Sequence, residues 1–178
     1  LTNYSGAFSL LYGKDRQGVY LNGSARLEKS SSVSGLPTGS GAKSMMCFFK
    51  LNSTGISNVA MGGFGDNATG RWDFWILDAT HMGIEGRNSY AMIEWTQDTS
   101  WHHICVTSPE GNSSWSSVSI YFDGVLQELS STSGSFNPTE NIITLGRIPG
   151  ADANSYTGNM DDFAIFNRVL TVDEVSNK

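Results

Sequence analysis

Apolar and polar residues alternate with a period of two along most of this chain, and clusters of Gly, Asn, Asp and Ser separate the alternating segments. Such a pattern, with breaks about 8–15 residues apart, is typical of an all-β sandwich or barrel. We predict strands at 18–28, 43–51, 58–64, 71–77, 81–85, 90–96, 101–108, 117–122 with its return 125–128, 142–147 and 158–166. Asp123-Gly124 predicts a two-residue hairpin turn, because this dipeptide tolerates the positive φ of a type I′ turn.

Between the strands the pattern predicts loops, at 30–41, 65–70, 109–116, 129–141 and 149–156. None has the character of an interdomain linker, since each is short and flanked by core-like strands. One short helix is expected near the end, where Thr171 can act as N-cap with Glu174 three residues later, a capping box. With 178 residues, the chain fits a single domain over 1–178. Because it begins at Leu1 without Met, we expect that domain to be part of a larger protein.

Composition excludes several classes of protein. Charged residues make up only 16% of the chain, which excludes a charged helical bundle or coiled coil, and 20 aromatic residues (9 Phe, 6 Tyr, 5 Trp) exclude disorder. The formal net charge of −6 disfavours nucleic acid as a partner, because binding a phosphate backbone depends on clustered Lys and Arg. No apolar run approaches the roughly 20 residues that span a bilayer, so we expect no membrane insertion.

Cys47 and Cys105 are the only cysteines, too few for a disulfide scaffold or a four-cysteine zinc site. Strand alternation is expected to point Cys47 toward the core. In the strand at 101–108, Ile104 and Val106 are expected to face the core, which points Cys105 the other way. We therefore favour two free thiols over a disulfide bridge.

Four blocks of the sequence resemble a known family. Residues 101–107 (WHHICVT), followed after a polar loop by 119–124 (SIYFDG), resemble the WHHVAVT and LYVDG block of laminin-G-like jelly rolls of the concanavalin A-like lectin class. Residues 158–171 (GNMDDFAIFNRVLT) are similar to the ending of that family, G-x-I-D-D/E-x-x-I-Y-N-R-A-L-S. Residues 18–23 and 44–50 resemble the family's early strands. The blocks occur in the family's order and cover nearly the whole chain.

The resemblance implies an all-β jelly-roll sandwich of two antiparallel sheets, one flat or convex and one concave, in the concanavalin A-like and laminin-G-like class. It also implies a domain that binds sugars or proteins in secreted or cell-surface proteins. The fold alone does not fix the ligand. Because the same fold hosts some glycoside hydrolases, an enzymatic function has to be tested on residues.

Catalytic residues are not indicated. Glycoside hydrolysis needs two carboxylates across a cleft, and the hydrolases of this fold carry them as Glu-x-Asp-x-Glu or Glu-x-Asp-x-x-Glu on one strand, a run that this chain lacks. Asp161 and Asp162 are adjacent and would point to opposite faces of a strand, while Glu85 and Glu94 lie on separate strands. The histidines at 102–103 fall in a family block and are expected to be structural. A hydrolase is therefore the least favoured hypothesis.

A sugar site needs flat aromatic rings and planar polar side chains, and residues 71–76 (RWDFWI) carry both. If Phe74 and Ile76 face the core, Asp73 and Trp75 share the concave face. For Trp75 we leave open whether it binds a ligand or only fills the sandwich; Trp72 and Trp101 are expected in the core. Neighbouring segments add side chains to the groove, and two loop aromatics add a rim. The expected ligand-binding residues are Asp73, Trp75, Arg87, Asn88, Tyr90, Trp95, and, on the rim, Trp115 and Tyr156.

The resemblance also implies a structural calcium ion. In the family such an ion is often held near the "IDD" segment with oxygens from the N-terminal strand region, and Ca²⁺ takes six to eight oxygen ligands. Here that points to Asp161 or Asp162, with Asn22 or Asp15 as additions. Alternatively, Asp162 pairs with Arg168 or faces solvent.

These observations lead to two hypotheses of different classes. The first is a non-catalytic carbohydrate-binding module of a secreted or cell-surface protein, a monomer that binds a polysaccharide or other glycan on the concave sheet beside neighbouring domains of its parent chain. The alternative is a protein-adhesion or spacer domain without glycan binding. The alternative predicts a featureless concave face and an exposed apolar patch elsewhere.

Overall fold

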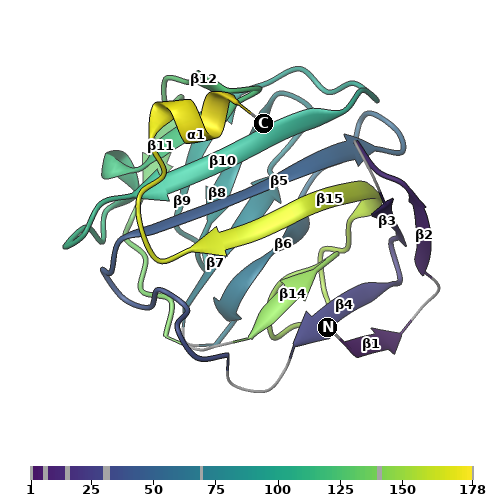
Figure 1. Cartoon of the computed structure of the whole chain (residues 1–178), viewed down its shortest axis with the longest axis horizontal. Coiled ribbons are helices and arrows are strands. Elements are labelled where there is room, and N and C mark those ends of the chain that lie inside the picture. Colours follow the sequence, from purple (N-terminus) through teal and green to yellow (C-terminus); the bar gives the residue numbers. More distant parts are fainter. Residues whose placement is uncertain are drawn as a thin grey trace.

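Two antiparallel sheets make up most of the computed structural model, which describes residues 2–5, 8–14, 17–29, 33–68, 70–139 and 142–177. Figure 1 shows the sheets stacked as two layers. The expected all-β jelly-roll sandwich is confirmed. No helix in the described ranges is long and apolar enough to cross a membrane.

The seven-stranded sheet is the front layer in Figure 1. Its strands, in spatial order, are β12 (Val125–Leu126), β11 (Ser119–Phe122), β10 (His102–Ser108), β5 (Lys43–Leu51), β15 (Thr157–Phe166), β3 (Gln17–Asn22) and β2 (Phe8–Tyr12). The final strand β15 lies between β5 and β3, so the predicted pairing of the C-terminal block with an N-terminal strand is confirmed.

The eight-stranded sheet is the back layer. Its strands, in spatial order, are β1 (Thr2–Ser5), β4 (Arg26–Lys29), β14 (Ile143–Leu145), β6 (Val59–Asp66), β7 (Gly70–Ile76), β8 (His81–Glu85), β9 (Tyr90–Glu94) and β13 (Ser131–Ser133). Strands β6 to β9 follow one another as a meander, because short turns join consecutive strands.

Most predicted strands are found within a few residues of their expected bounds, and three segments differ from the prediction. The segment 18–28 forms two strands in different sheets, because the side chain of Asn22 accepts hydrogen bonds from the backbone N–H groups of Ser24 and Ala25 and Gly23 adopts a positive φ of 81°. The predicted loop 129–141 contains β13. The predicted loop 109–116 leads into a 3-10 helix, η1 (Trp115–Ser117).

The main core lies between the sheets and takes the inward residues that alternation predicts. Trp72, Phe74 and Ile76 from β7 are fully buried there, as is Cys47 from β5. Cys105 belongs to a separate cluster on the other face of β10. Both thiols are buried and free, as predicted, and burial raises the pKa of each.

The predicted C-terminal helix is α1 (Val172–Ser176), with Thr171 and Glu174 forming the expected capping box. It covers the outer side of the seven-stranded sheet at β10 and β11 (Figure 1), where Val175 is buried beside Cys105 and Tyr121. The helix therefore closes a small second core.

Candidate functional site

Strand β7 gives the eight-stranded sheet a polar and aromatic outer face, meaning the face that points away from the other sheet. Because side chains alternate along a strand, burial of Trp72, Phe74 and Ile76 in the core places Arg71, Asp73 and Trp75 on the outer face. The predicted sharing of one face by Asp73 and Trp75 is thus confirmed.

Strand register brings further side chains to this face. Asp73 is paired with Glu85 of β8, and Glu85 with Tyr90 of β9. One row along, Trp75 is paired with Gly83, which is paired with Met92. Gly83 has no side chain to separate Trp75 from Met92, and the two belong to one apolar cluster.

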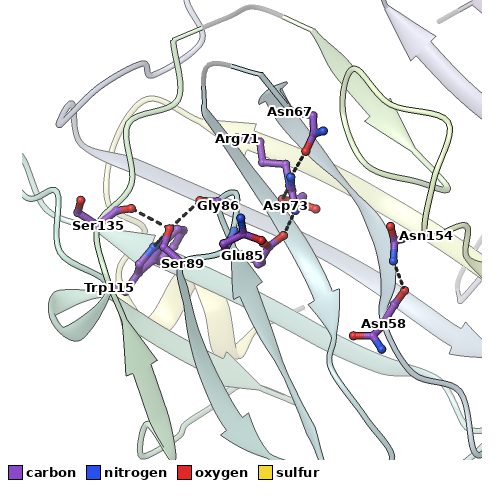
Figure 2. A network of polar contacts seen from close by, with 11 residues as sticks. Asn58, Asn67, Arg71, Asp73, Glu85, Gly86, Ser89, Trp115, Ser135 and Asn154 are labelled. Carbon is purple, nitrogen blue, oxygen red and sulfur yellow. Dashed lines mark hydrogen bonds and ion pairs between the residues drawn. The ribbon is translucent and has the colours of Figure 1, made fainter.

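A guanidinium group organises the polar part of the outer face (Figure 2). Arg71 donates through Nε to Oδ1 of Asp73 at 2.8 Å, through Nη2 to Oε2 of Glu85, and through Nη1 to Oδ1 of Asn67. The other oxygen of Glu85 accepts a hydrogen bond from the backbone N–H of Asn88 at 2.7 Å. Both oxygens of Glu85 and all three nitrogens of Arg71 therefore have partners.

Asp73 differs from Glu85 in its surroundings. Its side chain is fully buried, and its Oδ2 has no hydrogen-bond partner among the described residues. Burial raises the pKa of Asp73 well above its ordinary value; the charge of Arg71 opposes this shift and the charge of Glu85 adds to it. We conclude that Glu85 is the fully hydrogen-bonded partner of Arg71, while burial disfavours the charged form of Asp73.

The hairpin between β8 and β9 lies at one end of the polar cluster that Arg71 forms with Asp73, Glu85 and Asn67. Its turn residues Arg87 and Asn88 are exposed and both have positive φ, 57° and 67°. The Nη1 of Arg87 donates to the carbonyl oxygen of Ala68, which ties the hairpin tip to the turn that carries Asn67. Arg87, Asn88 and Tyr90 thus lie beside Glu85, and Tyr90 is only half-buried.

Trp75 is not an open stacking platform. Only 8% of it is exposed, because it packs against Ala60, Met92 and Ile148. The guanidinium carbon of Arg71 lies 5.8 Å from its ring centroid. Tyr90 is therefore the more accessible aromatic ring on the outer face.

The expected rim positions of Trp115 and Tyr156 are wrong. Both are fully buried in the core. The indole Nε1 of Trp115 donates to the Ser89 hydroxyl (Figure 2), and the Tyr156 hydroxyl donates to the carbonyl oxygen of Lys50 at 2.8 Å. The loss of alternation correctly predicted loops at these positions, but a residue in a loop can still place a large ring between the two sheets.

Trp95 is also mainly a core residue, 8% exposed, with its ring beside Phe49 and Phe122. It nevertheless lines a surface hollow of about 460 Å³. The other residues of this hollow are Thr80, His81, Glu94 and Thr96. Trp95 directly follows the last residue of β9, at the opposite end of that strand from Tyr90.

The residues expected to hold calcium do not come together as a set. Asn22 is paired with Thr157, four residues before Asp161 on β15, which separates the two by roughly 13 Å along the strand. Asn22 is therefore wrong as a partner of Asp161. Asp161 instead accepts hydrogen bonds from the backbone N–H groups of Lys14 and Asp162. Asp15 lies outside the described residues.

Asp162 is exposed and has a positive φ of 46° at the bulge in β15. Its expected partner Arg168 pairs with Glu174 instead. Across the part of the chain that the structure describes, no group of three or more His, Cys, Asp or Glu residues is arranged to hold a metal ion.

Sequence reasoning missed the roles of Arg71 and Glu85. Arg71 lies two residues before Asp73, so strand alternation already placed both on one face. Glu85 could have been found from the short turn between β7 and β8, since a hairpin turn fixes register; that register pairs Ile76 with Met82 and Asp73 with Glu85.

Exposed apolar side chains gather elsewhere. Val125 and Leu126 of β12 are 62% and 58% exposed, and Val169 and Val172, which flank the start of α1, are 41% and 58% exposed. Figure 1 shows β12 and α1 on the same side of the molecule. This is the feature that the adhesion hypothesis predicts.

Comparisons with known proteins agree with the fold. A family model described as the concanavalin A-like lectin/glucanases superfamily matches residues 22–176. No curated protein sequence matches the chain. Domain 4 of AbnA, a GH43 extracellular arabinanase from Geobacillus stearothermophilus, solved in complex with arabinotriose, is 17% identical with a TM-score of 0.68, and the match covers 97% of this chain and 81% of that chain.

Two toxin structures are similar as well. The binding domain of botulinum neurotoxin serotype G is 16% identical with a TM-score of 0.68, over 99% of this chain and 45% of that one. A structure of botulinum neurotoxin type C, whose cell entry is described as dependent upon interaction with two ganglioside molecules, is 16% identical with a TM-score of 0.65, over 99% and 44%. This chain therefore spans a little under half of each toxin chain, and at these identities the likeness shows the fold alone.

Proposed function

Because the chain belongs to the concanavalin A-like lectin/glucanases superfamily, whose fold leaves the ligand open, we propose from its side chains that it is a non-catalytic glycan-binding module. The glycan binds on the outer face of the eight-stranded sheet. The observation that carries this proposal is a set of planar polar groups fixed beside aromatic rings on a face that the core does not use.

The accessible part of this site is Arg87, Asn88 and Tyr90. Their positions are held from below, because Glu85 fixes the backbone of Asn88 and Arg87 is bonded to Ala68. A site whose groups are already ordered loses little conformational entropy on binding. Sugar hydroxyls suit the amide and guanidinium groups, and the apolar side of a sugar ring suits the Tyr90 ring.

The same geometry argues against hydrolysis. Asp73 and Glu85 form a cross-strand pair of carboxylates, which a glycosidase would need. However, Arg71 binds both, Asp73 is fully buried and Glu85 is only 6% exposed. Neither group can reach a glycosidic oxygen or activate a water molecule. The pair therefore holds Arg71 and the outer face in place and takes no part in a reaction.

Known relatives of this fold favour the proposal and a location outside the cell. One similar domain was solved with arabinotriose and belongs to an extracellular arabinanase, and another protein interacts with gangliosides. We propose that this domain likewise acts outside the cell or at its surface. There it would hold a glycan for neighbouring domains of its parent chain.

Binding can be tested with an array that includes arabino-oligosaccharides, ganglioside oligosaccharides and neutral polysaccharides. The Tyr90→Ala variant should lose about tenfold in affinity, or about 1.4 kcal/mol. The matched control is Tyr20→Ala, since Tyr20 lies between the core residues Val19 and Leu21 and is half-buried on the other sheet. Absence of binding to every glycan, or equal losses for both variants, would refute the proposal.

Protein adhesion is a second candidate, favoured by the exposed Val125 and Leu126. Exposed apolar patches often mark interaction surfaces. The Leu126→Ser variant should leave glycan affinity unchanged if the glycan binds on the outer face. Its effect on attachment of the parent protein to cells would measure the contribution of the patch.

A further inference from the structure

An exposed carboxylate lies at one end of the outer face. Glu94 of β9 is paired with His81 of β8 and points to the same side of the sheet as Met92 and Tyr90. It lines two surface hollows: the one of about 460 Å³ that Trp95 also lines, and one of about 430 Å³ formed with residues 125–130. We call the first the Glu94 hollow.

The polar side chains around the Glu94 hollow differ in whether they have hydrogen-bond partners. His81 is held through Nδ1 by the Asp78 carboxylate at 3.1 Å and by the Thr80 hydroxyl at 3.0 Å. Glu94 is exposed and makes no hydrogen bond or ion pair with any residue that the structure describes. Its carboxylate therefore remains available as an acceptor, next to the hydroxyls of Thr80 and Thr96.

Two arginines are, in contrast, already paired with carboxylates. Arg71 binds Asp73 and Glu85, and Arg147 binds Asp152 at 2.8 Å. Arg87 is exposed and donates to the Ala68 carbonyl oxygen, but it lies in the turn before β9, at the opposite end of that strand from Glu94. An anionic ligand at Arg71 or Arg147 would have to break an ion pair, in a chain with a net charge of −6. A cationic group would meet an unengaged carboxylate and a favourable field.

We infer that the Glu94 hollow binds the protonated amine of an amino sugar, so that the glycan class is one with free amino groups, such as glucosamine oligomers. This inference rests on the proposed function. Glu94 and Tyr90 are four residues apart on one strand, roughly 13 Å, so a single oligosaccharide along β9 contacts both. An ammonium donor to a carboxylate forms a charge-assisted hydrogen bond, which is stronger than one between neutral groups.

The test compares oligomers of equal length by isothermal titration calorimetry: glucosamine, N-acetylglucosamine and a sulfated sugar. The variants are Glu94→Gln, which keeps the shape and removes the charge, and Asp173→Asn, which removes one charge from the first turn of α1 on the other sheet. We expect glucosamine oligomers to bind about tenfold more tightly than the acetylated ones. Glu94→Gln should abolish that preference, Asp173→Asn should keep it, and the sulfated oligomer should bind weakest.

The possible outcomes separate the two proposals. If neutral oligomers bind as tightly as glucosamine oligomers and still depend on Tyr90, the amino-sugar inference fails and the glycan-binding proposal stands. If no glycan binds, both fail. A lysine oligomer is the control for charge alone: if it binds as tightly as the sugar with the same dependence on Glu94, the hollow recognises cationic peptides, and the inference is overturned.

Discussion

The two carboxylates around Arg71 should respond differently when each is replaced by its amide. The structure assigns the balancing charge to Glu85, whose two oxygens both accept hydrogen bonds. Burial disfavours the charged form of Asp73, which is fully buried with one oxygen unpartnered within the described part of the chain. The informative pair of variants is therefore Asp73→Asn and Glu85→Gln.

Asp73→Asn imitates the protonated acid and should change the free energy of unfolding by less than about 1 kcal/mol at neutral pH. The sign of the pH effect follows from the raised pKa. Between the ordinary pKa of an aspartate, about 3.9, and the higher folded-state pKa of Asp73, the folded chain binds more protons than the unfolded chain. Stability of the wild type therefore falls as pH rises through this interval, and the variant gains relative to it.

Glu85→Gln removes the negative charge that balances a buried guanidinium. Breaking a buried pair by removing one partner costs about 3–5 kcal/mol. Asp73 can recover part of this by ionising beside Arg71 at 2.8 Å, so we expect a loss of about 3 kcal/mol. With a urea m-value of roughly 2 kcal/mol/M, the midpoint should fall by about 1.5 M.

The assay is urea unfolding followed by tryptophan fluorescence, repeated at several values between about pH 5 and about pH 8. Two of the five tryptophans, Trp72 and Trp75, lie in β7 close to Asp73, so part of the signal reports on this strand. The reasoning is refuted if Asp73→Asn costs as much as Glu85→Gln, or if the two variants show the same dependence on pH.

Three further predictions concern other parts of the molecule. His102 lies 2.8 and 3.0 Å from two aspartate oxygens; burial lowers its pKa, but these hydrogen bonds outweigh burial and raise it. Its stabilising effect, about 1 kcal/mol, should be complete below about pH 6.5 and disappear as pH rises through the folded-state pKa; a His102→Gln variant that parallels the wild type at every pH would contradict this. A chain that ends at Leu170 should fold, with a loss of roughly 1.5–3 kcal/mol in the free energy of unfolding from the missing helix contact. A chain that ends at Tyr156 lacks β15 and should not fold. A cooperative thermal transition in this shorter chain would contradict the prediction. If calcium binds at Asp161, the melting temperature should be higher in calcium than in EDTA, and equal values would count against that site.

The sequence predicted the strands that carry the candidate site, but it did not predict which residues pack around that site. The bounds of β5 and β8 were predicted to the residue, and alternation in β7 separated Trp72 from Asp73 and Trp75. The same reasoning placed Trp115 on a rim, because a loop assignment says nothing about what the loop packs against. The structure inserts its ring against Trp72 and Phe136, at centroid distances of 5.0 and 4.6 Å.

What the sequence by itself determined is which side chains share a face, because the two-residue period is a property of each strand alone. Which strands become neighbours, and what covers a face, depend on contacts between segments far apart in the chain. Only the tertiary structure could bring Ile148 over Trp75 and shield Asp73 from water. The pKa of Asp73 and the accessibility of Trp75 depend on that covering. Burial sets the free-energy cost of ionising Asp73, and it limits the contact that a ligand can make with Trp75.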